Sequence, residues 1–480
     1  MTTALVWLRN DLRLADNPAL FAAVSESDAV APVFIWAPGE SGLWSPGPAT
    51  RAWLALSLKA LARSIDSRGG RLLIAAGQTG ITLLALAAET GATTVHWNQR
   101  YEPALTELDS RVRDHLEAAG LRVVIHSDSL LREPSTLLST SGRPYRVFTP
   151  FMNASERGST PAFPLPAPGR IPAPIGLREA IDPASVLPTS GDAPDIAAHW
   201  TPGEAGATAR ADRFFSDLAD VYAHDRDWPG IEGTSKLSPH LAFGEISPRT
   251  LWHRAQEQVH HNGSHRLPEG TAAFVRQLQW REFAYHLVHH FPETTERPLR
   301  RRFEIFPWSR DPVAFEAWEH GMTGFPMVDA GMREMLATGW MHNRVRMLVA
   351  SFLTKDLLLP WLDGARSFWE HLADADLPNN TLGWQWVAGC GADAAPYFRV
   401  FNPVAQGEKF DPDGRYVKRW VPELEGLSPE GIHRPWAAPS NVLASAGVVL
   451  GARYPQPIVD HAAARLRALA IYGSMRDVVE

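Results

Sequence analysis

The sequence predicts an α/β N-terminal domain followed by an all-α C-terminal domain. Short apolar runs alternate with amphipathic stretches over the first 130 residues, a proline-rich connector follows, and helical periodicity dominates the rest. A chain of 480 residues has room for about two such domains, because single cores usually stop growing near roughly 250 to 300 residues. We expect the α/β domain at 1–130, the connector at 131–205 and the helical domain at 206–475.

Five apolar, β-branched runs in the first domain have the length and composition of buried strands, and good helix formers such as TRAWLALSLKALARSI lie between them. This alternation is typical of βαβ units, so we expect a Rossmann-like parallel five-stranded sheet with helices on both faces. The first strand runs into RNDLRLADNP without a G-x-G-x-x-G, so the usual dinucleotide fingerprint is missing. The expected strands are 4–8, 31–36, 71–76, 93–97 and 122–126.

The connector and the second domain differ sharply in composition. From about 155 to 205 the chain is rich in Pro, Gly, Ala and Ser, as in STPAFPLPAPGRIPAPIG, which cannot form a helix or a central strand. Beyond it, the segments 274–291 and 341–361 have helical periodicity. The second domain is therefore predicted to be mostly helical.

Composition places the chain among ordinary globular proteins, with 45% hydrophobic and 21% charged residues. No apolar run approaches the roughly 20 residues of a membrane span, and MTTALVWLRNDLRL is not typical of a secretion signal. The single cysteine, Cys390, excludes an internal disulfide and favours a cytoplasmic protein. We also expect a monomer with no metal site.

The charge and the tryptophans point in different directions. The net charge of -7 argues mildly against nucleic acid, but a phosphate backbone senses only charges within a Debye length of about 10 Å. The run Arg300–Arg302 is either part of a basic patch or a solvated face. The 18 tryptophans indicate an aromatic ligand or base stacking, because indole is costly as core filler.

Polar and aromatic residues share faces of the predicted helices. Gln277, Trp280 and Arg281 lie on one stripe of 274–291, which suits a cavity or groove, although Trp280 packed and Gln277 exposed would also explain them. The segment GTSKLSPHLAFGEISP concentrates three hydroxyls at a helix start, where hydroxyls and backbone amides bind phosphate. N-capping explains one of these hydroxyls but not three.

The chain resembles the DNA photolyase and cryptochrome family over nearly its whole length, and is most similar to bacterial cyclobutane pyrimidine dimer photolyases of class I or III. The resemblance implies an N-terminal antenna domain and a C-terminal helical domain that holds a U-shaped FAD. Six blocks follow in the family's order: WLRNDLRLADNPAL, RDWPGIEGTSKLSPHLAFGEISP, WREF, TGFPMVDAGMREMLATGWMHNRVRM, ASFLTKDLLLPW and GWQWVAGCGADAAPYFRVFNPVAQGEKF.

The resemblance assigns roles around the flavin. Arg346 and Asp374 match a salt bridge beside the isoalloxazine, and Asn380 matches the asparagine near flavin N5. Trp384, Trp361 and Trp308 match an electron-transfer triad, with core packing as the alternative. The remaining cofactor-binding residues implied are Tyr222, Thr234, Ser235, Lys236, Leu237, Ser238, Phe274, Arg281, Asn343 and Asp376.

The resemblance also implies a partner, DNA with a flipped-out pyrimidine dimer, and a light-driven carbon–carbon lyase reaction by electron transfer from reduced FAD. A weakly stacked lesion costs less to extrude, and photolyases are among the known base-flipping enzymes. Asn343 and Met347 favour the cyclobutane substrate, because a histidine pair is expected there in (6-4) photolyases. The DNA-binding residues implied are Arg226, Gln277, Trp280, Arg344, Trp386, Arg399, Gln406 and Lys409.

Two departures from the family's pattern stand out. Gln277 occupies the place of a glutamate that could adjust its protonation, so we expect a lower repair yield or an altered lesion choice. Ala104 and Leu105 replace a polar pair of folate-binding relatives, which leaves a deazaflavin, a folate in another mode, another flavin or no antenna. The alternative functions are a cryptochrome-like photoreceptor, (6-4) repair and a light-independent nucleic-acid-binding flavoprotein.

Overall fold

The computed structural model describes residues 2–127, 130–177, 181–187, 191, 193–261, 266–397 and 399–476. The chain divides into two compact units, each described here by itself. The first comprises Met1–Asp220, Ser235–Pro292 and Ala373–Pro378, and the second comprises Val221–Thr234, Glu293–Leu372 and Asn379–Glu480. Within the described ranges, no helix has the length and apolarity to cross a membrane.

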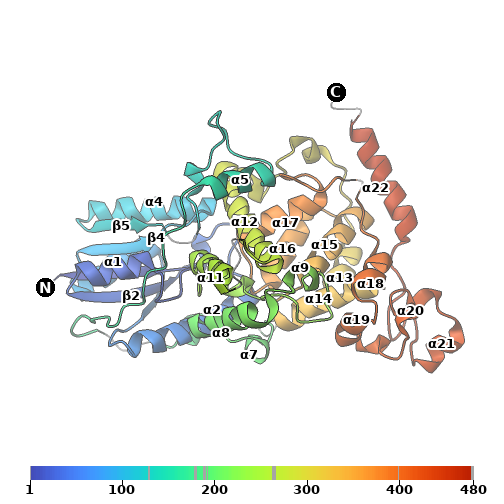
Figure 1. Cartoon of the computed structure of the whole chain (residues 1–480), viewed down its shortest axis with the longest axis horizontal. Helices are drawn as coiled ribbons and strands as arrows, with labels where there is room; N and C mark the ends of the chain where they lie inside the picture. Colours follow the sequence, from blue (N-terminus) through green and yellow to red (C-terminus); the bar gives the residue numbers. More distant parts are fainter. Residues whose placement is uncertain are drawn as a thin grey trace. The chain divides into compact units, whose positions relative to one another are not determined.

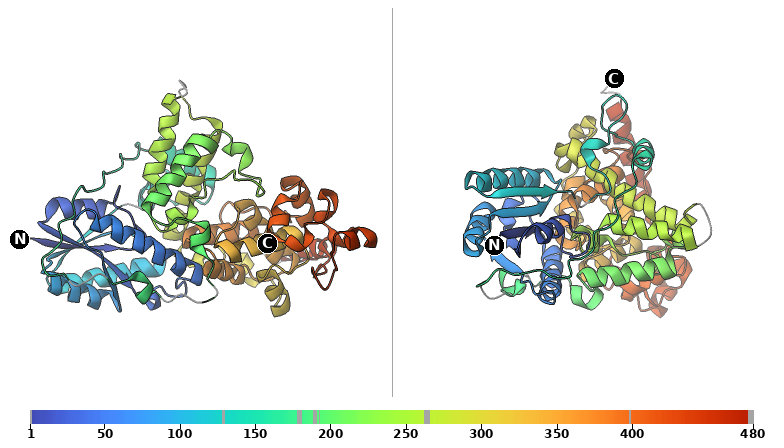
Figure 2. Two further views of the ribbon diagram at one scale, coloured as in Figure 1. Left: turned by 90° about the horizontal axis from the view of Figure 1, so that it is seen from below. Right: turned by 60° about the vertical axis from the view of Figure 1, so that its left-hand side comes forward.

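The first unit contains the predicted parallel sheet, in the order β3-β2-β1-β4-β5 (Figures 1 and 2). The central strands are buried along their whole length because helices cover both faces. The prediction of a Rossmann-like α/β domain is confirmed, and four strands begin or end one or two residues from their expected bounds. The strands are β1 (Thr3–Leu8), β2 (Ala29–Trp36), β3 (Leu73–Ala76), β4 (Thr94–Asn98) and β5 (Arg122–His126).

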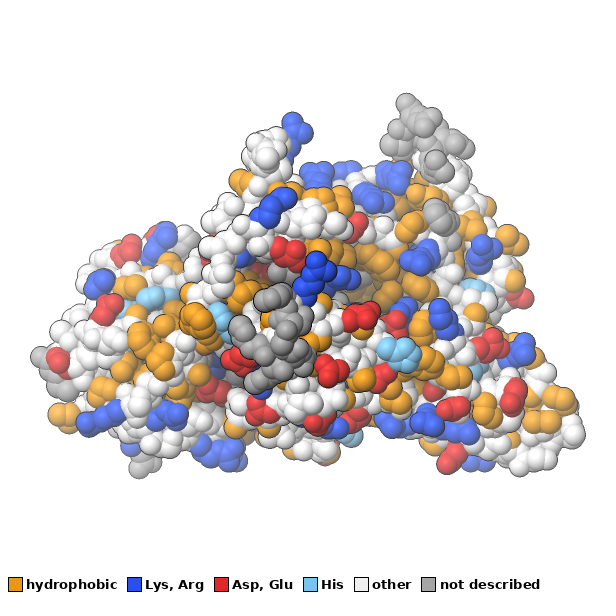
Figure 3. Space-filling view, viewed as in Figure 1, with side chains coloured by type: hydrophobic (Ala, Val, Ile, Leu, Met, Phe, Trp, Pro, Cys, Tyr) orange, Lys and Arg blue, Asp and Glu red, His pale blue; other side chains and the backbone are white. Residues whose placement is uncertain are grey.

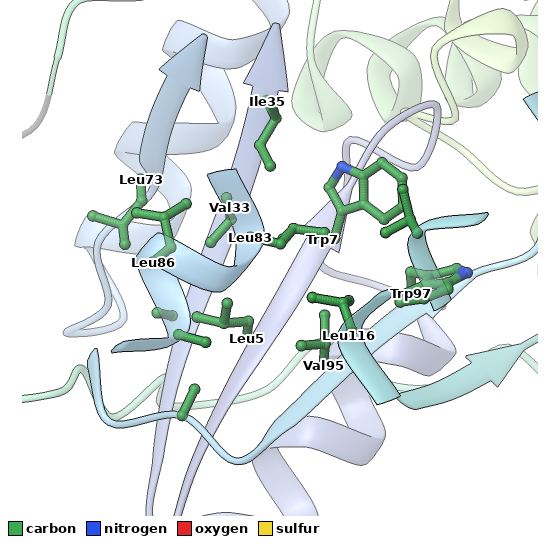
Figure 4. Close-up of a cluster of buried hydrophobic side chains, with 14 of the residues drawn as sticks. Leu5, Trp7, Val33, Ile35, Leu73, Leu83, Leu86, Val95, Trp97 and Leu116 are labelled. Atoms are coloured by element: carbon green, nitrogen blue, oxygen red, sulfur yellow. The ribbon is translucent and has the colours of Figure 1, made fainter. Parts of the chain in front are cut away.

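Helices pack on the two faces of the sheet as the alternation of elements requires. One core cluster joins Leu5 and Trp7 of β1 to Leu83 and Leu86 of α3 (Thr79–Thr90) and to Leu116 of α4 (Pro103–Ala118) (Figure 4). The alternate β1 residues Ala4, Val6 and Leu8 are equally buried, and α1 (Pro18–Glu26) packs against β1, β2 and β4. The sheet thus forms a continuous apolar layer.

The strand order reverses direction between β1 and β4, since β2 and β3 lie on one side of β1 and β4 and β5 lie on the other. Ligands of open α/β sheets usually bind outside the carboxyl ends of strands at such a point. Residues that follow β1 and β4 directly are therefore the natural ligand-facing groups of this sheet.

The rest of the first unit consists of helices joined by irregular segments such as 158–177, which contains no helix or strand. The longest helix, α12, is buried on most of its faces, so its polar side chains need partners inside the protein. The α-helices of this part are α2 (Pro48–Asp66), α5 (Phe148–Arg157), α6 (Pro183–Val186), α7 (Ile196–His199), α8 (Glu204–Arg213), α10 (Ser238–Ala242), α11 (Pro248–His261) and α12 (Glu269–His290).

The second unit is also helical, which confirms the predicted all-α part. The segment 341–361 does not form one helix: α15 ends in a π-helical turn at Phe352–Asp356, Leu358 takes a left-handed φ of 56°, and Pro360 precedes the next helix. Proline cannot continue a helix, so Trp361 begins a new one. The helices named below are α9 (Tyr222–Asp225), α13 (Pro312–Glu319), α14 (Pro326–Thr338), α15 (Asn343–Ser351), α16 (Trp361–His371), α17 (Leu377–Ala388) and α18 (Pro403–Phe410).

A buried carboxylate ties the connector to α12. The backbone N–H groups of Leu131 and Arg132 donate to Glu282 Oε2 at 2.8 and 3.0 Å. Glu282 is 2% exposed, and burial raises the pKa of its carboxyl from 4.5 to about 7 in spite of these two donors. The connection is polar but deeply desolvated.

Because the pKa of Glu282 is raised in the folded state, we expect ionisation of its carboxyl to lower the free energy of unfolding as pH rises. The unfolded state loses the proton at a pKa of 4.5 and the folded state at about 7, so stability is fully present below 4.5 and falls up to about 7. We expect the unfolding free energy of the wild type, relative to Glu282→Gln, to fall by about 3 kcal/mol over that window.

Equilibrium urea unfolding at a series of pH values measures this difference. Glu107→Gln is the matched control, since Glu107 is in an exposed ion pair with Arg111. If the stability difference between the wild type and Glu282→Gln stays constant from about pH 4.5 to 7.5, the assignment of the raised pKa is wrong.

Candidate active site

The predicted residues are divided between the two units. The first unit holds the α10 and α12 residues and the two aspartates: Ser235, Lys236, Leu237, Ser238, Phe274, Gln277, Trp280, Arg281, Asp374 and Asp376. The second unit holds Tyr222, Arg226, Thr234, Trp308, Asn343, Arg344, Arg346, Met347, Trp361, Asn380, Trp384, Trp386, Arg399, Gln406 and Lys409. The Arg346–Asp374 pairing joins residues of different units and stays a prediction.

Within the first unit, Tyr285 of α12 brings Arg281 and Asp376 together. The Tyr285 hydroxyl donates to Asp376 Oδ2 at 2.6 Å, and Arg281 donates to the same hydroxyl at 3.3 Å. Burial, followed by the nearby Asp376 carboxylate, raises the pKa of the Tyr285 phenol. Tyr285 therefore stays neutral and acts as a hydrogen-bond donor that fixes Asp376.

A small polar cavity adjoins this group at the point where the strand order reverses. Its wall includes Asn10 after β1, Glu102 after β4, and Arg281 and Tyr285 of α12. The volume is about 20 Å³, which admits about one water molecule. Burial raises the pKa of the Glu102 carboxyl. The cavity has the polarity of a ligand site but not the volume for a fused ring system.

The other α12 residues face different surroundings. The Gln277 amide donates to Ala273 O of its own helix at 3.3 Å and is half-buried. The Trp280 indole is also half-buried and stacks on Phe148, a residue that the sequence analysis did not single out. Before α10, Lys236 takes a left-handed φ of 51°, a strained conformation that often occurs at functional sites.

In the second unit, the structure gathers the three predicted triad tryptophans near α16. The Trp384 ring is 2% exposed, and its indole N–H is buried with no hydrogen-bond partner among the described residues. It packs against Gly364, which lies one turn after Trp361 on the same helix. Ser309 N donates to Leu358 O at 2.7 Å, which brings the residue after Trp308 close to the start of α16.

Further aromatic rings surround Trp384. Phe368 of α16 and the fully buried Trp318 of α13 both meet it edge to face, with ring centroids 4.9 and 6.1 Å away. The ring of Trp308 packs on that of Phe306, with ring centroids 4.3 Å apart. The sequence analysis missed Trp318, whose only signal was its membership of an unusually tryptophan-rich chain.

The predicted DNA-facing arginine of α15 is held in place on two sides. Arg344 pairs with Asp227 at 2.6 Å, and its guanidinium lies 4.2 Å from the centre of the Phe410 ring. On the same helix, Asn343 is exposed, and its amide lies 4.0 Å from the Met347 sulfur. The two positions that the resemblance predicts to select the lesion therefore share a face, as their spacing predicts.

Arg399, Gln406 and Lys409 lie on or just before α18. Arg399 and Lys409 are exposed, and Gln406 is half-buried. The Arg399 carbonyl accepts a hydrogen bond of 2.8 Å from the fully buried Lys355, whose pKa burial lowers to about 8. On the face drawn in Figure 3, basic side chains lie interspersed with acidic ones, which agrees with the modest net charge.

Two family models match the chain: residues 4–169 match DNA photolyase, and residues 274–474 match the FAD binding domain of DNA photolyase. A deoxyribodipyrimidine photo-lyase of Agrobacterium fabrum is 47% identical over 475 residues, which is 98% of each chain. Cryptochrome-1 of Arabidopsis thaliana is 39% identical over 96% of this chain and 69% of its own length.

A solved structure gives the same likeness in three dimensions. The crystal structure of a bacterial class III photolyase from Agrobacterium tumefaciens superposes with a TM-score of 0.94 at 46% identity. The superposition covers 99% of this chain and 98% of the other. The fold and its order of elements are thus shared over nearly the full length.

The packing of Trp384 predicts that Gly364 tolerates no side chain. A Cβ atom there would lie 2.2 Å from the Trp384 ring and 2.5 Å from Leu353, so Gly364→Ala must displace the indole. We expect a loss of about 1 to 3 kcal/mol in the free energy of unfolding, together with a changed near-ultraviolet circular dichroism spectrum.

Gly383→Ala is the control, because a Cβ atom at Gly383 of α17 would meet no atom of the described residues within 4 Å. Alanine is the better helix former, so this variant should gain up to about 1 kcal/mol. Equal stabilities of the two variants in urea unfolding would show that Gly364 does not constrain Trp384.

Proposed function

This chain belongs to the DNA photolyase and cryptochrome family, and from this premise we propose that it is a light-driven deoxyribodipyrimidine photo-lyase that repairs cyclobutane pyrimidine dimers in DNA. One observation carries the proposal beyond family membership: successive residues of α12 present an indole, Trp280, and a guanidinium, Arg281, that is connected through Tyr285 to Asp376. A single helix thus joins the lesion-facing group to a flavin-lining group.

The chemistry of the donor set fits FAD. Thr234, Ser235 and Ser238 offer hydroxyl donors for phosphate, and Lys236 adds a positive charge between them. Asp374 and Asp376 are carboxylate acceptors, suited to ring N–H and ribityl hydroxyl groups. Asn380, whose amide donates to Ala365 O at 2.9 Å, keeps its oxygen as an acceptor.

When bound in its reduced form, FAD would supply light-driven donation of one electron to the dimer, and the electron would return to it after the ring splits. The protein's own residues orient and exclude water. Trp280 offers an apolar face to an extruded pyrimidine, and base–aromatic stacking contributes about 1 to 3 kcal/mol. Trp384 and Trp361 are buried and Trp308 is half-buried, and these three indoles would replace one long electron-transfer step to the cofactor with several shorter ones.

The basic residues provide affinity for DNA without sequence preference. Arg344 is the best placed of them, since its ion pair with Asp227 and its contact with Phe410 limit its rotamers before DNA arrives. A pre-ordered guanidinium loses less conformational entropy when it binds phosphate. Arg399 and Lys409 extend the same charge on exposed positions.

The likeness to Arabidopsis cryptochrome supports a second candidate, a blue-light photoreceptor that shares the flavin and the tryptophans. Illumination of the FAD-loaded chain with an oligonucleotide that contains a cyclobutane dimer separates the two. We expect light-dependent loss of the dimer and none in the dark. Flavin photoreduction without any dimer loss would contradict repair and favour the photoreceptor.

Gln277 is proposed to lower the yield of repair per photon. Its amide cannot deliver a proton to the pyrimidine carbonyl, whereas a carboxylic acid can. We expect Gln277→Glu to raise the yield on cyclobutane dimers several-fold at unchanged FAD content. The measurement is repair yield on cyclobutane and (6-4) substrates side by side, and no gain on the cyclobutane substrate would count against this role.

A further inference from the structure

We propose that Phe148 is a positioning residue for the lesion: its ring covers one face of Trp280 and thereby fixes the plane on which an extruded pyrimidine stacks. The inference rests on the proposed function and adds to it a residue outside the six sequence blocks that carry the family resemblance. Phe148 is the first residue of α5, which lies within the connector, whereas Trp280 belongs to α12.

The two rings form a nearly parallel stack. Their centroids are 3.7 Å apart and their planes differ by 6°, whereas Trp280 and Phe283 meet edge to face, with centroids 5.9 Å apart and planes 71° apart. A parallel ring at van der Waals distance covers the face that it meets. A base that stacks on Trp280 must therefore use the opposite face.

Phe148 cannot easily leave this position. It is 5% exposed and also packs edge to face on Phe283, 5.9 Å away. Phe283 in turn contacts Phe151, one turn further along α5, at 5.2 Å. The ring is thus part of a packed aromatic cluster between α5 and α12 and not a movable gate.

The backbone before Phe148 is fixed at two points on α12. Tyr145 N, three residues before Phe148, donates to His286 Nε2 at 3.0 Å. Further upstream, Leu131 and Arg132 donate to Glu282. Burial, followed by the neighbouring histidines, lowers the pKa of His286 to about 3, so its ring stays neutral and accepts this bond near neutral pH.

The physical consequence is pre-organisation of Trp280. A half-buried indole with one unsupported face can rotate about χ2, and that freedom is lost when a base stacks on it. Phe148 removes this freedom in advance. Since aromatic pairs contribute beyond their buried area, removal of the ring should weaken lesion binding about 2- to 12-fold. Affinity for undamaged DNA depends on phosphate contacts and should not change.

The test uses the full chain loaded with FAD, in the dark, and two duplex oligonucleotides that differ only by one cyclobutane dimer. Phe148→Leu removes the ring and Phe148→Tyr keeps it. Trp280→Ala reports whether the lesion uses the indole at all. Phe163→Leu is the control, because Phe163 is 80% exposed and stacks on His253 elsewhere in the same unit.

We expect Phe148→Leu to weaken binding of the dimer-containing duplex about 2- to 12-fold. Its affinity for the undamaged duplex and its FAD content should not change. Phe148→Tyr and Phe163→Leu should bind both duplexes as the wild type does. Repair at saturating dimer should stay within about 2-fold, so the loss appears in KM and not in kcat. If Phe148→Leu does not fold, Phe148→Met replaces it in the test, because methionine is close to leucine in volume.

The two possible failures differ. Wild-type dimer affinity in Phe148→Leu, beside a clear loss in Trp280→Ala, overturns the positioning role and leaves the proposed function intact. An equal loss on damaged and undamaged DNA also overturns the positioning role. Unchanged dimer affinity in Trp280→Ala contradicts the use of Trp280 by the lesion, and with it this part of the proposed function.

Discussion

The hydrogen bonds from the backbone of Leu131 and Arg132 to the buried Glu282 carboxylate hold the connector on α12, and the part of the candidate site that contains Trp280 depends on them. The first part of the connector leads into α5, so this contact, with the bond from Tyr145 to His286, sets where Phe148 begins its helix. Phe148 then supports Trp280. A polar contact that costs desolvation is retained because an unpaired carboxylate or unpaired backbone amides at the same depth would cost more.

The same helix connects to the flavin-lining residues by a second set of polar contacts. Because α12 is buried on most faces, Arg281 and Tyr285 must find partners within the protein, and they find each other and Asp376. In the proposed function, α12 therefore carries both Trp280, the proposed stacking surface for an extruded base, and the bonds to Asp376, a proposed flavin-lining carboxylate. Catalysis by excited-state electron transfer needs this kind of rigidity, since the transfer depends steeply on distance and the protein contributes position, electrostatics and exclusion of water.

The sequence was sufficient for the elements whose signal is local. The five strands follow from β-branched runs, and the second unit's helical character follows from its periodicity. The sequence analysis treated 341–361 as one helical segment because of its apolar periodicity and missed the break before Trp361. Pro360 was the residue that could have indicated this break. The sequence could not predict the contacts Phe148–Trp280, Tyr285–Asp376 and Asp227–Arg344. The two residues of each pair are at least 91 positions apart in the chain, and no local pattern encodes such a contact. Tyr285 in particular had the spacing of a core residue, and only its hydroxyl, directed at Asp376, distinguishes it.

A crystal structure of the chain with FAD and an oligonucleotide that contains a cyclobutane dimer is the most direct test of the central claim, which is that α12 presents the lesion to the flavin. The account predicts the extruded dimer against the face of Trp280 opposite Phe148, with the Phe148 stack and the Tyr285–Asp376 hydrogen bond preserved. A dimer bound away from α12, or a Trp280 ring rotated off Phe148 to receive it, would contradict the account.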